Sequence, residues 1–470
     1  HRLTSAAGLG GGEIGAGDGR AFQQEAERLQ AKGLLGPEGV EYDPYGGLDA
    51  RGDVLALFVG TEPVERADPG QVVSVVLPRT PFYVESGGQV SDSGVVRGDG
   101  DGAWEIAVER VARPAAGMLV HTGRVVRGSP RVGDAAAAAV DEARRWDIMR
   151  NHTATHLLHA SLRRVLGEHA RQAGSLVAAD RLRFDLTHSS ALSREELDQI
   201  EKMVNDAILA NEPVVVRFLP LKQAMAEGAT ALFGEAYGET VRTIRIGGEP
   251  WFSYELCGGT HVPETGVIGP FFIISEASAA AGIRRIEAVT GRAAVEFASR
   301  HIQGHQNLVL KLGVDAGQAE RKVEDLLRLE KQYRDLFESR LAEEAKKHLQ
   351  GLEPRIVSGV PVLVESVPDL SGDQLRTLID HWRGLHPTFV AVFGSAPSGK
   401  PVIVAGLSKD LVARGLHGGQ IAESAARQMG GGGGGSPTLG QAGGRDADRL
   451  AAALAEARRW IEERLSQRRD

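Results

Sequence analysis

Cysteine is nearly absent from this chain, with one residue, Cys257, among 470. A single cysteine excludes an internal disulfide and fits a reducing cytoplasm, where we expect the protein to work. No apolar run approaches the length needed to cross a bilayer, and the amino end has no hydrophobic region of the kind found in signal peptides. We therefore expect no membrane partner.

The chain also lacks an excess of positive charge. Its 54 Lys and Arg residues face 62 Asp and Glu residues, a formal net charge of −8 at pH 7. Nucleic-acid binding would therefore depend on local basic patches. With 42% hydrophobic and 25% charged residues, the composition is ordinary for a globular protein, and the length predicts two to four domains. The chain does not begin with Met, which favours a fragment of a longer protein.

Two well-separated motifs indicate a metal site. The lone cysteine is followed four residues later by His261, and far upstream His152 and His156 lie at helical spacing. Residues four apart share one face of a helix, so the upstream imidazoles project together. A thiolate and a third imidazole from a glycine-containing loop complete a tetrahedral Zn2+ set. We therefore predict that His152, His156, Cys257 and His261 bind Zn2+; the alternative is a buried thiol with histidines of the core.

The histidine spacing alone is weak evidence. With 14 histidines in 470 residues, a given spacing recurs about 0.4 times by chance. His301 and His305 repeat it, but Gly304 weakens a helix there and no further ligands stand nearby. A histidine at a set offset from the lone cysteine has a chance of roughly 3%, so the coincidence of both pairs is the stronger signal. His159 continues the face of His152 and is predicted to pack or to support the ligands.

The same motif bears on the chemistry. Thr153 stands where a His-Glu-x-x-His metalloprotease carries its general base, so peptidase activity is disfavoured. Four protein ligands close the coordination sphere and indicate a structural zinc, unless one ligand is loose and water or substrate replaces it.

The residue composition of the N-terminal third changes along the chain. Residues 1–48 read as a Gly-rich lead or linker remnant with one short helical pattern around 22–29. Residues 49–140 hold β-branched runs punctuated by Gly, Pro and Asp, which predict a small antiparallel barrel or sheet. The runs are 54–59, 72–77, 104–111 and 118–126.

Residues 141–295 predict an α+β domain that carries the metal ligands. Apolar spacing predicts a helix over 141–166, and the capping box Ser193 to Glu196 begins another. The expected strands are 214–218, 241–246 and 271–274, with the Cys257 loop between two of them.

The remaining residues predict a spacer and a last domain. Residues 296–350 are charged and helix-favouring, which indicates a long helix or a helical hairpin. Residues 351–470 alternate short apolar strands with helical segments, the pattern of a small α/β domain. The fold class is thus α+β: a small β-barrel, a zinc-binding α+β domain, a helical spacer and a C-terminal α/β domain.

Two glycine motifs in the last domain resemble nucleotide sites only in part. Residues 394–400 are one residue short of a P-loop, Pro401 stands where Ser or Thr should be, and a strand follows instead of a helix, so we predict a turn. The run Gly430–Gly435 is predicted to be a flexible loop.

Five segments, in order, resemble the editing half of alanyl-tRNA synthetases. They are RTPFYVESGGQ at 79–89, NHTATHLLH at 151–159, QAGSL at 172–176, SYELCGGTHV at 253–262 and GIRRIEAVTG at 282–291. The C-terminal stretch is more weakly similar to that family's DHH-associated tail domain, with Ser436 and Thr438 where Arg and Asp are usual.

The resemblance implies an editing hydrolase. Its substrate would be tRNA(Ala) mischarged with serine or glycine, and its products free amino acid and tRNA. By analogy Thr80 senses the serine hydroxyl and Gln89 holds the ester or the attacking water; taken without the resemblance, Thr80 is equally an ordinary strand residue and Gln89 a turn residue. Amide groups of Gly87 and Gly88 are candidates to stabilise the oxyanion.

Four arginines are candidates for contacts with the phosphates of the acceptor end. They are Arg163, Arg164, Arg284 and Arg285. The alternative for each is a solvated surface position favoured by a helix dipole.

Three functional alternatives stay open. The chain is either the C-terminal portion of an alanine–tRNA ligase, which the motifs favour, or a long free-standing alanyl-tRNA editing protein. The third is a non-catalytic, zinc-stabilised tRNA-binding module. We expect no aminoacylation by this chain alone, and a homodimer through the spacer or the C-terminal domain is left open.

Overall fold

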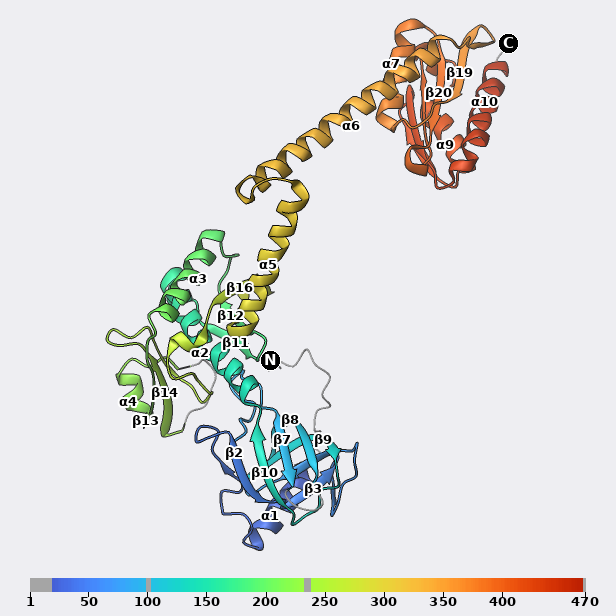
Figure 1. Ribbon diagram of the computed structural model, residues 1–470. Coiled ribbons are helices and arrows are strands. Elements are labelled where there is room, and N and C mark those ends of the chain that lie inside the picture. The colour runs from blue at the N-terminus through green and yellow to red at the C-terminus, as the bar shows by residue number, and fades with distance from the viewer. Residues whose placement is uncertain (1–18, 99–102, 232–237, 468–470) are drawn as a thin grey trace. The chain divides into compact units, whose positions relative to one another are not determined.

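The computed structural model describes residues 19–98, 103–231 and 238–467. The chain forms two compact units, His1–His305 and Gln306–Asp470. Figure 1 shows the elements of each unit, and each unit is described by itself. No helix within the described ranges combines the length and apolar character needed to cross a membrane.

The first unit begins with an eight-stranded antiparallel sheet. All four runs predicted as strands are strands, and the hydrogen-bonded order is β2-β10-β7-β8-β9-β5-β3-β4. The order starts at β2 and ends at β4 among the described residues, so a closed barrel is not confirmed. The bounds are β2 Asp49–Asp53, β3 Ala56–Val59, β4 Glu62–Val64, β5 Val72–Val76, β7 Gly94–Gly98, β8 Glu105–Ala115, β9 Met118–Arg127 and β10 Ala135–Val140.

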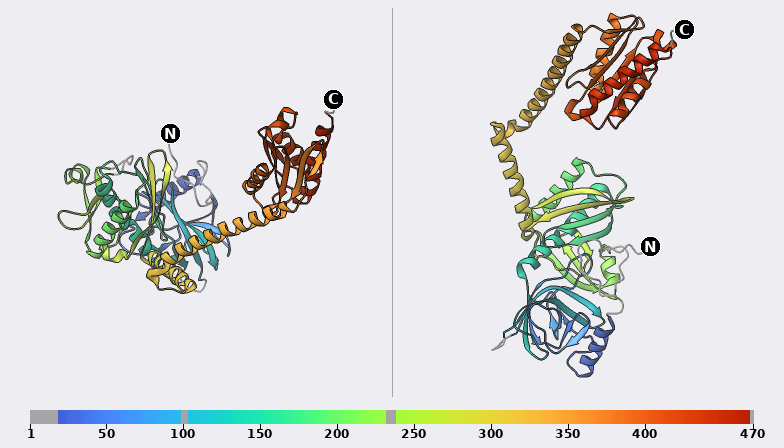
Figure 2. Two further views of the ribbon diagram at one scale, coloured as in Figure 1. Left: turned by 90° about the horizontal axis from the view of Figure 1, so that it is seen from above. Right: turned by 90° about the vertical axis from the view of Figure 1, so that its right-hand side faces the viewer.

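Residues 19–48 pack onto this sheet. Helix α1 (Gly19–Ala31) places Phe22 against Phe58, with ring centroids 4.5 Å apart. Leu35 and Val40 join the same buried cluster. Strand β1 (Glu41–Tyr42) then pairs in parallel with β6 (Arg79–Thr80). Figure 2 shows α1 beside the sheet, so this stretch belongs to the folded core of the unit.

The helix that carries His152 and His156 forms where the spacing predicts it. Helix α2 (Glu142–Leu166) begins at Asp141, whose side chain accepts the Arg144 amide, and ends at Gly167. The predicted capping box opens α3 (Arg194–Leu209): the Ser193 side chain accepts from Glu196, and the Glu196 side chain accepts from Ser193. Both helices contribute to one apolar core together with Phe184 and Ile286, which belong to the four-stranded sheet described next.

Two smaller sheets complete the first unit. A four-stranded sheet has the order β11-β12-β17-β16 and a three-stranded one the order β13-β14-β15. The loop that carries Cys257 follows β15, which the sequence pattern did not predict. The bounds are β11 Gln172–Val177, β12 Leu182–Thr187, β13 Val214–Pro220, β14 Thr240–Ile246, β15 Ser253–Leu256, β16 Phe271–Ala280 and β17 Ile283–Thr290, with the short helix α4 Leu221–Ala226.

The predicted spacer is helical. It contains α5 (Gly291–Leu312) and α6 (Ala319–Gln350). Gly313 follows α5 with a φ of 63°, in the region that only glycine adopts easily, so the helix ends there.

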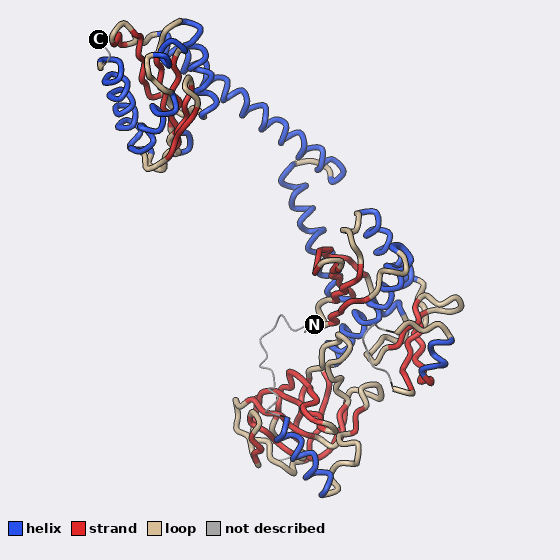
Figure 3. The backbone as a smooth tube through the Cα atoms, turned by 180° about the vertical axis from the view of Figure 1, so that it is seen from behind, coloured by secondary structure: helices blue, strands red, loops and turns tan. Residues whose placement is uncertain are grey.

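After α6, the second unit contains a sheet with helices, in the stretch where the sequence predicts an α/β domain. Its six-stranded sheet has the order β18-β19-β20-β21-β23-β22, and Figure 3 shows its strands among helices. Leu363 of β19 packs with α7, whereas its neighbours Val362 and Val364 pack with α9 and α10. Successive strand residues point to opposite faces, so the sheet is covered on both sides. The bounds are β18 Arg355–Val357, β19 Val360–Ser366, α7 Gly372–Leu385, β20 Val390–Ser395, β21 Val402–Leu407, α8 Lys409–Ala413, α9 Gly418–Gln428, β22 Gly432–Gly435, β23 Leu439–Gly443 and α10 Leu450–Ser466.

The glycine run is not a flexible loop, so that prediction is wrong. Gly432–Gly435 form the edge strand β22, paired with β23. A Cβ on Gly433 would lie 2.7 Å from the Ala442 Cβ, and a Cβ on Gly419 of α9 would lie 2.8 Å from the Gly435 nitrogen. The glycines therefore permit close backbone packing. The P-loop-like stretch is a turn, as predicted, with a short 3-10 helix at Pro397–Gly399 before β21.

Candidate metal site

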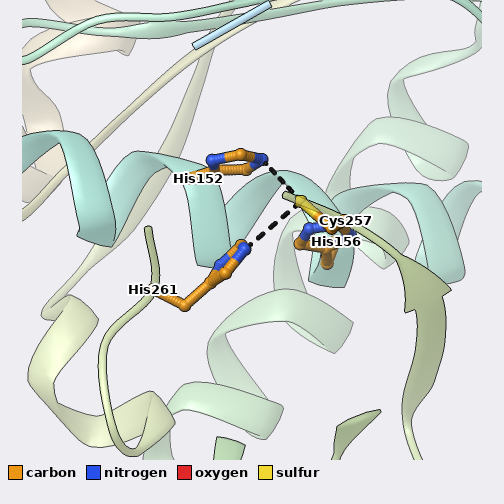
Figure 4. Close-up of side chains that lie close together, drawn as sticks. All are labelled: His152, His156, Cys257 and His261. Atoms are coloured by element: carbon orange, nitrogen blue, oxygen red, sulfur yellow. Dashed lines mark hydrogen bonds between the residues drawn. The ribbon is translucent and has the colours of Figure 1, made fainter. Parts of the chain in front are cut away.

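The four predicted ligands meet in one cluster. His152 and His156 lie one turn apart on α2, with stacked rings whose centroids are 5.4 Å apart. Cys257 and His261 come from the loop after β15. The Cys257 Sγ lies 3.4 Å from the Nε2 of both His152 and His261, and one donor atom from each of the four side chains lies within 4.8 Å of the others (Figure 4).

A hydrogen bond orients His152 toward the cluster centre. Its Nδ1–H donates to Gln89 Oε1 at 2.6 Å, which leaves Nε2 free to face the thiol. The same Gln89 oxygen accepts the Thr260 amide at 3.0 Å, and Gln89 Nε2 donates to the Thr260 hydroxyl at 2.9 Å. Gln89 is completely buried. It therefore ties the helix of one ligand pair to the loop of the other.

Glu255 performs the same task for His156. Its carboxylate accepts from His156 Nδ1 at 2.6 Å and from His159 Nδ1 at 2.9 Å. The Nε2 of His156 is buried and has no hydrogen-bond partner among the described residues. His159 thus shares a carboxylate with the candidate ligand His156, and its support of a metal ligand stays a prediction.

Thr153 orients the third imidazole. Its hydroxyl donates to the Met149 carbonyl at 2.9 Å and accepts from His261 Nδ1 at 3.2 Å. All three imidazoles therefore present Nε2 to the centre.

The electrostatics favour a cation at this centre. Burial alone would raise the pKa of the Cys257 thiol, but the imidazoles of His152, His261 and His156 hold it well below its usual value. Burial acts to lower the pKa of His156, yet Glu255 and Cys257 outweigh it and raise that pKa to about 10. Burial and His152 lower the pKa of His261 to about 3. The cluster thus favours a thiolate beside an imidazolium, whose proton a metal ion would replace.

The donor set fits a zinc ion. Three imidazole nitrogens and one thiolate within mutual reach are ligands that Zn2+ prefers, and the buried, unpartnered His156 Nε2 lacks only such a partner. Gly259 is required by the packing, since a Cβ there would lie 1.9 Å from His152 Cε1. A Cβ on the neighbouring Gly258 would meet no atom within 4 Å, so the loop is open on that side.

Thr80 is buried and its hydroxyl already has partners. His121 Nδ1 lies 3.2 Å from the Val75 carbonyl, an arrangement in which Nδ1 carries the proton. The Thr80 hydroxyl therefore donates to His121 Nε2 at 2.7 Å and accepts the Phe82 amide at 3.1 Å. The Thr80 oxygen has one lone pair left. To sense serine as predicted, that lone pair would have to accept a hydrogen bond from the serine hydroxyl.

The two turn glycines adopt positive φ values, 59° for Gly87 and 86° for Gly88. Their turn is closed by hydrogen bonds between Ser86 and Gln89 in both directions, at 3.2 and 3.0 Å. The turn therefore places Gln89 beside the metal cluster. The predicted oxyanion role of the two amides stays a prediction.

The four arginines are already engaged by protein groups. Arg163 pairs with Glu168, and Arg164 stacks over the Phe252 ring at 4.1 Å. Two further ion pairs join strands of the four-stranded sheet: Arg284 with Glu276 at 2.5 Å and Arg285 with Asp185 at 2.7 Å. Contacts of these arginines with RNA stay predictions.

Sequence reasoning missed Glu255 and Thr153 as supports of the metal ligands. Glu255 lies two residues before Cys257 and Thr153 directly after His152, so proximity to a ligand was the available signal. His301, from the other histidine pair, is exposed and its Nδ1 bonds the Phe297 carbonyl on its own helix.

Three family models match the chain. Residues 21–144 match "tRNA synthetases class II (A)", and residues 241–287 match "Threonyl and Alanyl tRNA synthetase second additional domain". Residues 359–463 match "DHHA1 domain". The first match begins within α1 and the second includes Cys257 and His261.

Curated relatives are alanine–tRNA ligases. The protein from Herpetosiphon aurantiacus is 44% identical over 427 residues, which cover 88% of this chain and 48% of the relative. The protein from Geobacillus thermodenitrificans is 40% identical over 448 residues, which cover 94% of this chain and 50% of the relative. This chain spans about half the length of the curated relatives it matches. The crystal structure of the C-Ala domain from Aquifex aeolicus alanyl-tRNA synthetase also matches, with 23% sequence identity and a TM-score of 0.22. The match covers 24% of this chain and 99% of that chain.

Proposed function

Because the chain belongs to the alanyl-tRNA synthetase family, of which it represents the C-terminal portion, we propose that it hydrolyses mischarged seryl- or glycyl-tRNA(Ala). The observation that carries the proposal is the cluster of His152, His156, Cys257 and His261, which includes ligands from the matched second additional domain. Gln89 joins this cluster from the preceding sheet region.

The need for such a reaction follows from the limits of a small pocket. An alanine site excludes larger side chains by volume, but it cannot strongly reject glycine, which is smaller, or serine, which adds one hydroxyl. A second site that hydrogen-bonds the hydroxyl can select serine and spare alanine. Thr80 is the proposed residue for this contact.

We propose zinc as the metal. When bound, it would supply a positive centre that positions the ester or polarises an oxygen. The chain's own residues hold the ligands in place: Gln89 fixes His152, Glu255 fixes His156, and Thr153 fixes His261. Because four protein ligands fill a tetrahedron, water or the ester oxygen could contact the zinc only if one ligand is displaced. With all four ligands in place, we expect the zinc to position substrate indirectly, by holding the helix and the loop around it, rather than to activate water.

The test compares three charged tRNAs. Zinc-loaded protein should release serine from seryl-tRNA(Ala) and glycine from glycyl-tRNA(Ala), and should leave alanyl-tRNA(Ala) intact. No release of serine or glycine would refute editing and would favour the non-catalytic zinc-stabilised module.

The Cys257→Ala variant tests the site itself. It should lose zinc, measured as metal per chain, together with deacylation. Unchanged metal content in that variant would show that the cluster is not the zinc site.

The broader activity and the alternatives are tested separately. Incubation with alanine, ATP and tRNA(Ala) should give no alanyl-tRNA(Ala) from this chain alone. A free-standing editing protein shares the proposed hydrolysis, so the deacylation assay applies equally to that alternative.

A homodimer is proposed through the spacer. Helix α6 exposes large apolar side chains on its surface, and sedimentation analysis should reveal a dimer if they pair. The exposed residues are Leu326, Leu327, Leu329, Tyr333, Leu336 and Phe337.

A further inference from the structure

An exposed aromatic ring lies at the rim of the metal site. The Tyr45 side chain is 47% exposed, and its hydroxyl donates to the Gly258 carbonyl at 2.5 Å. Gly258 is the residue after the ligand Cys257. The backbone beneath the ring is held by Asp43, whose carboxylate accepts the amides of Tyr45 and Gly46 at 3.1 and 2.9 Å. Tyr45 is thus fixed next to the ligand loop while much of it faces solvent.

Arg242 supports the ring from one side. Its guanidinium carbon lies 4.2 Å from the Tyr45 ring centroid, a cation–π contact. Its Nη1 donates to the carbonyls of Cys257 and Gly259, both at 2.8 Å. One arginine therefore contacts both the ring and the ligand loop. If the ring turned away, it would lose its cation–π contact with Arg242 and its hydrogen bond to Gly258. The guanidinium covers one face of the ring, and 47% of the side chain stays exposed.

The geometry points to a base-stacking site, and this inference rests on the proposed function. We propose that Tyr45, supported by Arg242, stacks on the terminal adenine of the aminoacyl-tRNA. The scissile ester is attached to the ribose of that adenosine, so an ester at the metal site places the base only a few bonds away. Exposed aromatic rings and guanidinium groups are the side chains on which unpaired bases stack.

The position of the ring explains what it contributes. A stacked base fixes the ribose and hence the direction from which the ester meets the cluster, whichever amino acid is attached. Tyr45 would then improve binding of all charged tRNA(Ala) species equally. Selection of serine over alanine would come from elsewhere in the site.

Three substitutions separate stacking from support of the loop. Tyr45→Phe keeps the ring and removes the hydrogen bond to Gly258, Tyr45→Leu removes both, and Tyr45→Trp keeps a larger ring. Tyr333→Leu is the matched control, because Tyr333 is 64% exposed and lies on α6 in the other unit. Zinc per chain is measured for every variant.

The readout is fluorescence of tRNA(Ala) that ends in 2-aminopurine and carries serine through a non-hydrolysable amide. Stacking quenches 2-aminopurine, so the native protein, Tyr45→Phe, Tyr45→Trp and the control should quench it, and Tyr45→Leu should not. Loss of one stacked base corresponds to roughly 5- to 150-fold weaker binding, and the KM for seryl-tRNA(Ala) should rise by that factor with kcat changed less.

Two results would overturn the proposal. Unchanged quenching in Tyr45→Leu would show that the base stacks elsewhere or not at all. Equal loss in Tyr45→Phe and Tyr45→Leu would assign the effect to the hydroxyl and the loop. Because quenching requires no hydrolysis, a native protein that quenches but releases no serine would refute the proposed function and leave the stacking site standing.

Discussion

Replacement of Gln89 by leucine tests how the metal site is held together. Leucine has nearly the volume of glutamine but cannot accept the His152 Nδ1–H or the Thr260 amide, and it cannot donate to the Thr260 hydroxyl. Two buried N–H groups would then lack partners. Each costs about 1–3 kcal/mol, so we expect the free energy of unfolding to fall by about 2–6 kcal/mol.

The same change should weaken zinc binding. His152 would lose the acceptor that fixes its ring and its proton on Nδ1. Removal of such an outer partner costs about 10- to 100-fold in metal affinity, or about 1.4–2.7 kcal/mol. The assay is a competition titration with a zinc chelator, together with urea unfolding followed by circular dichroism.

Gln89→Glu separates orientation from direct action on the substrate. A carboxylate still accepts from His152 and from the Thr260 amide, and the Thr260 hydroxyl can rotate to donate to it. Zinc affinity should therefore stay within about ten-fold of the native value, and deacylation should persist. If Gln89 instead held the ester or water through its amide N–H, this variant would bind zinc and fail to release serine.

The control is Gln172→Leu, which removes a hydrogen bond from Gln172 to Ser175 on β11 and touches no metal ligand. It should leave zinc affinity unchanged. Native zinc affinity in Gln89→Leu would refute the orienting role that we derive for Gln89.

Further changes address other parts of the first unit. Gly259→Ala should abolish zinc binding because its Cβ would lie 1.9 Å from His152, whereas Gly258→Ala meets no atom within 4 Å and should bind zinc normally; metal per chain distinguishes them. Burial lowers the pKa of His121 to about 4, so stability present above pH 6.5 should be lost as pH falls from 6.5 toward 4, by about 3 kcal/mol, and His121→Gln should lack this loss in urea unfolding. Asp92→Ala leaves a buried arginine without its partner and should cost about 3–5 kcal/mol in the same assay.

The cluster of four candidate metal ligands was predictable because each pair is local in sequence. His152 and His156 need only one helix, and its cap at Asp141 and stop at Gly167 are also local signals. Cys257 and His261 need only one short loop. Whether the two pairs meet depends on the tertiary structure. It could be inferred from the sequence because zinc is bound by few residue types.

The supporting residues were not predictable to the same degree. Glu255 becomes a partner of His156 only because β15 delivers it to α2, and β15 itself was missed. The engagement of Thr80 by His121 likewise depends on tertiary structure, because Thr80 lies on β6 and His121 on β9 of another sheet. Residue type alone cannot show whether a polar side chain has already been satisfied by a distant partner.

The glycine run failed for a related reason. Its composition suggests flexibility when the chain is considered by itself. In the fold, β23 supplies hydrogen bonds along Gly432–Gly435, and Gly419 on α9 lets that helix approach Gly435. In this fold the glycine-rich composition therefore gives a closely packed strand instead of a flexible loop.

Helix α2 and the loop that carries Gln89, between β6 and β7, are joined by several hydrogen bonds, which couples zinc binding to stability in this unit. Arg145 lies two helical turns before His152, and its side chain pairs with Asp92 and donates to the Pro81 carbonyl at 2.9 Å. Arg144 donates to the Ser91 carbonyl at 2.9 Å, and Gln89 accepts directly from His152. The segment from Pro81 to Asp92 is therefore anchored at both ends against one helix. A substitution at Asp92 should shift Gln89 and weaken zinc binding even though it contacts no ligand, whereas an equally destabilising change in the second unit should leave zinc affinity intact.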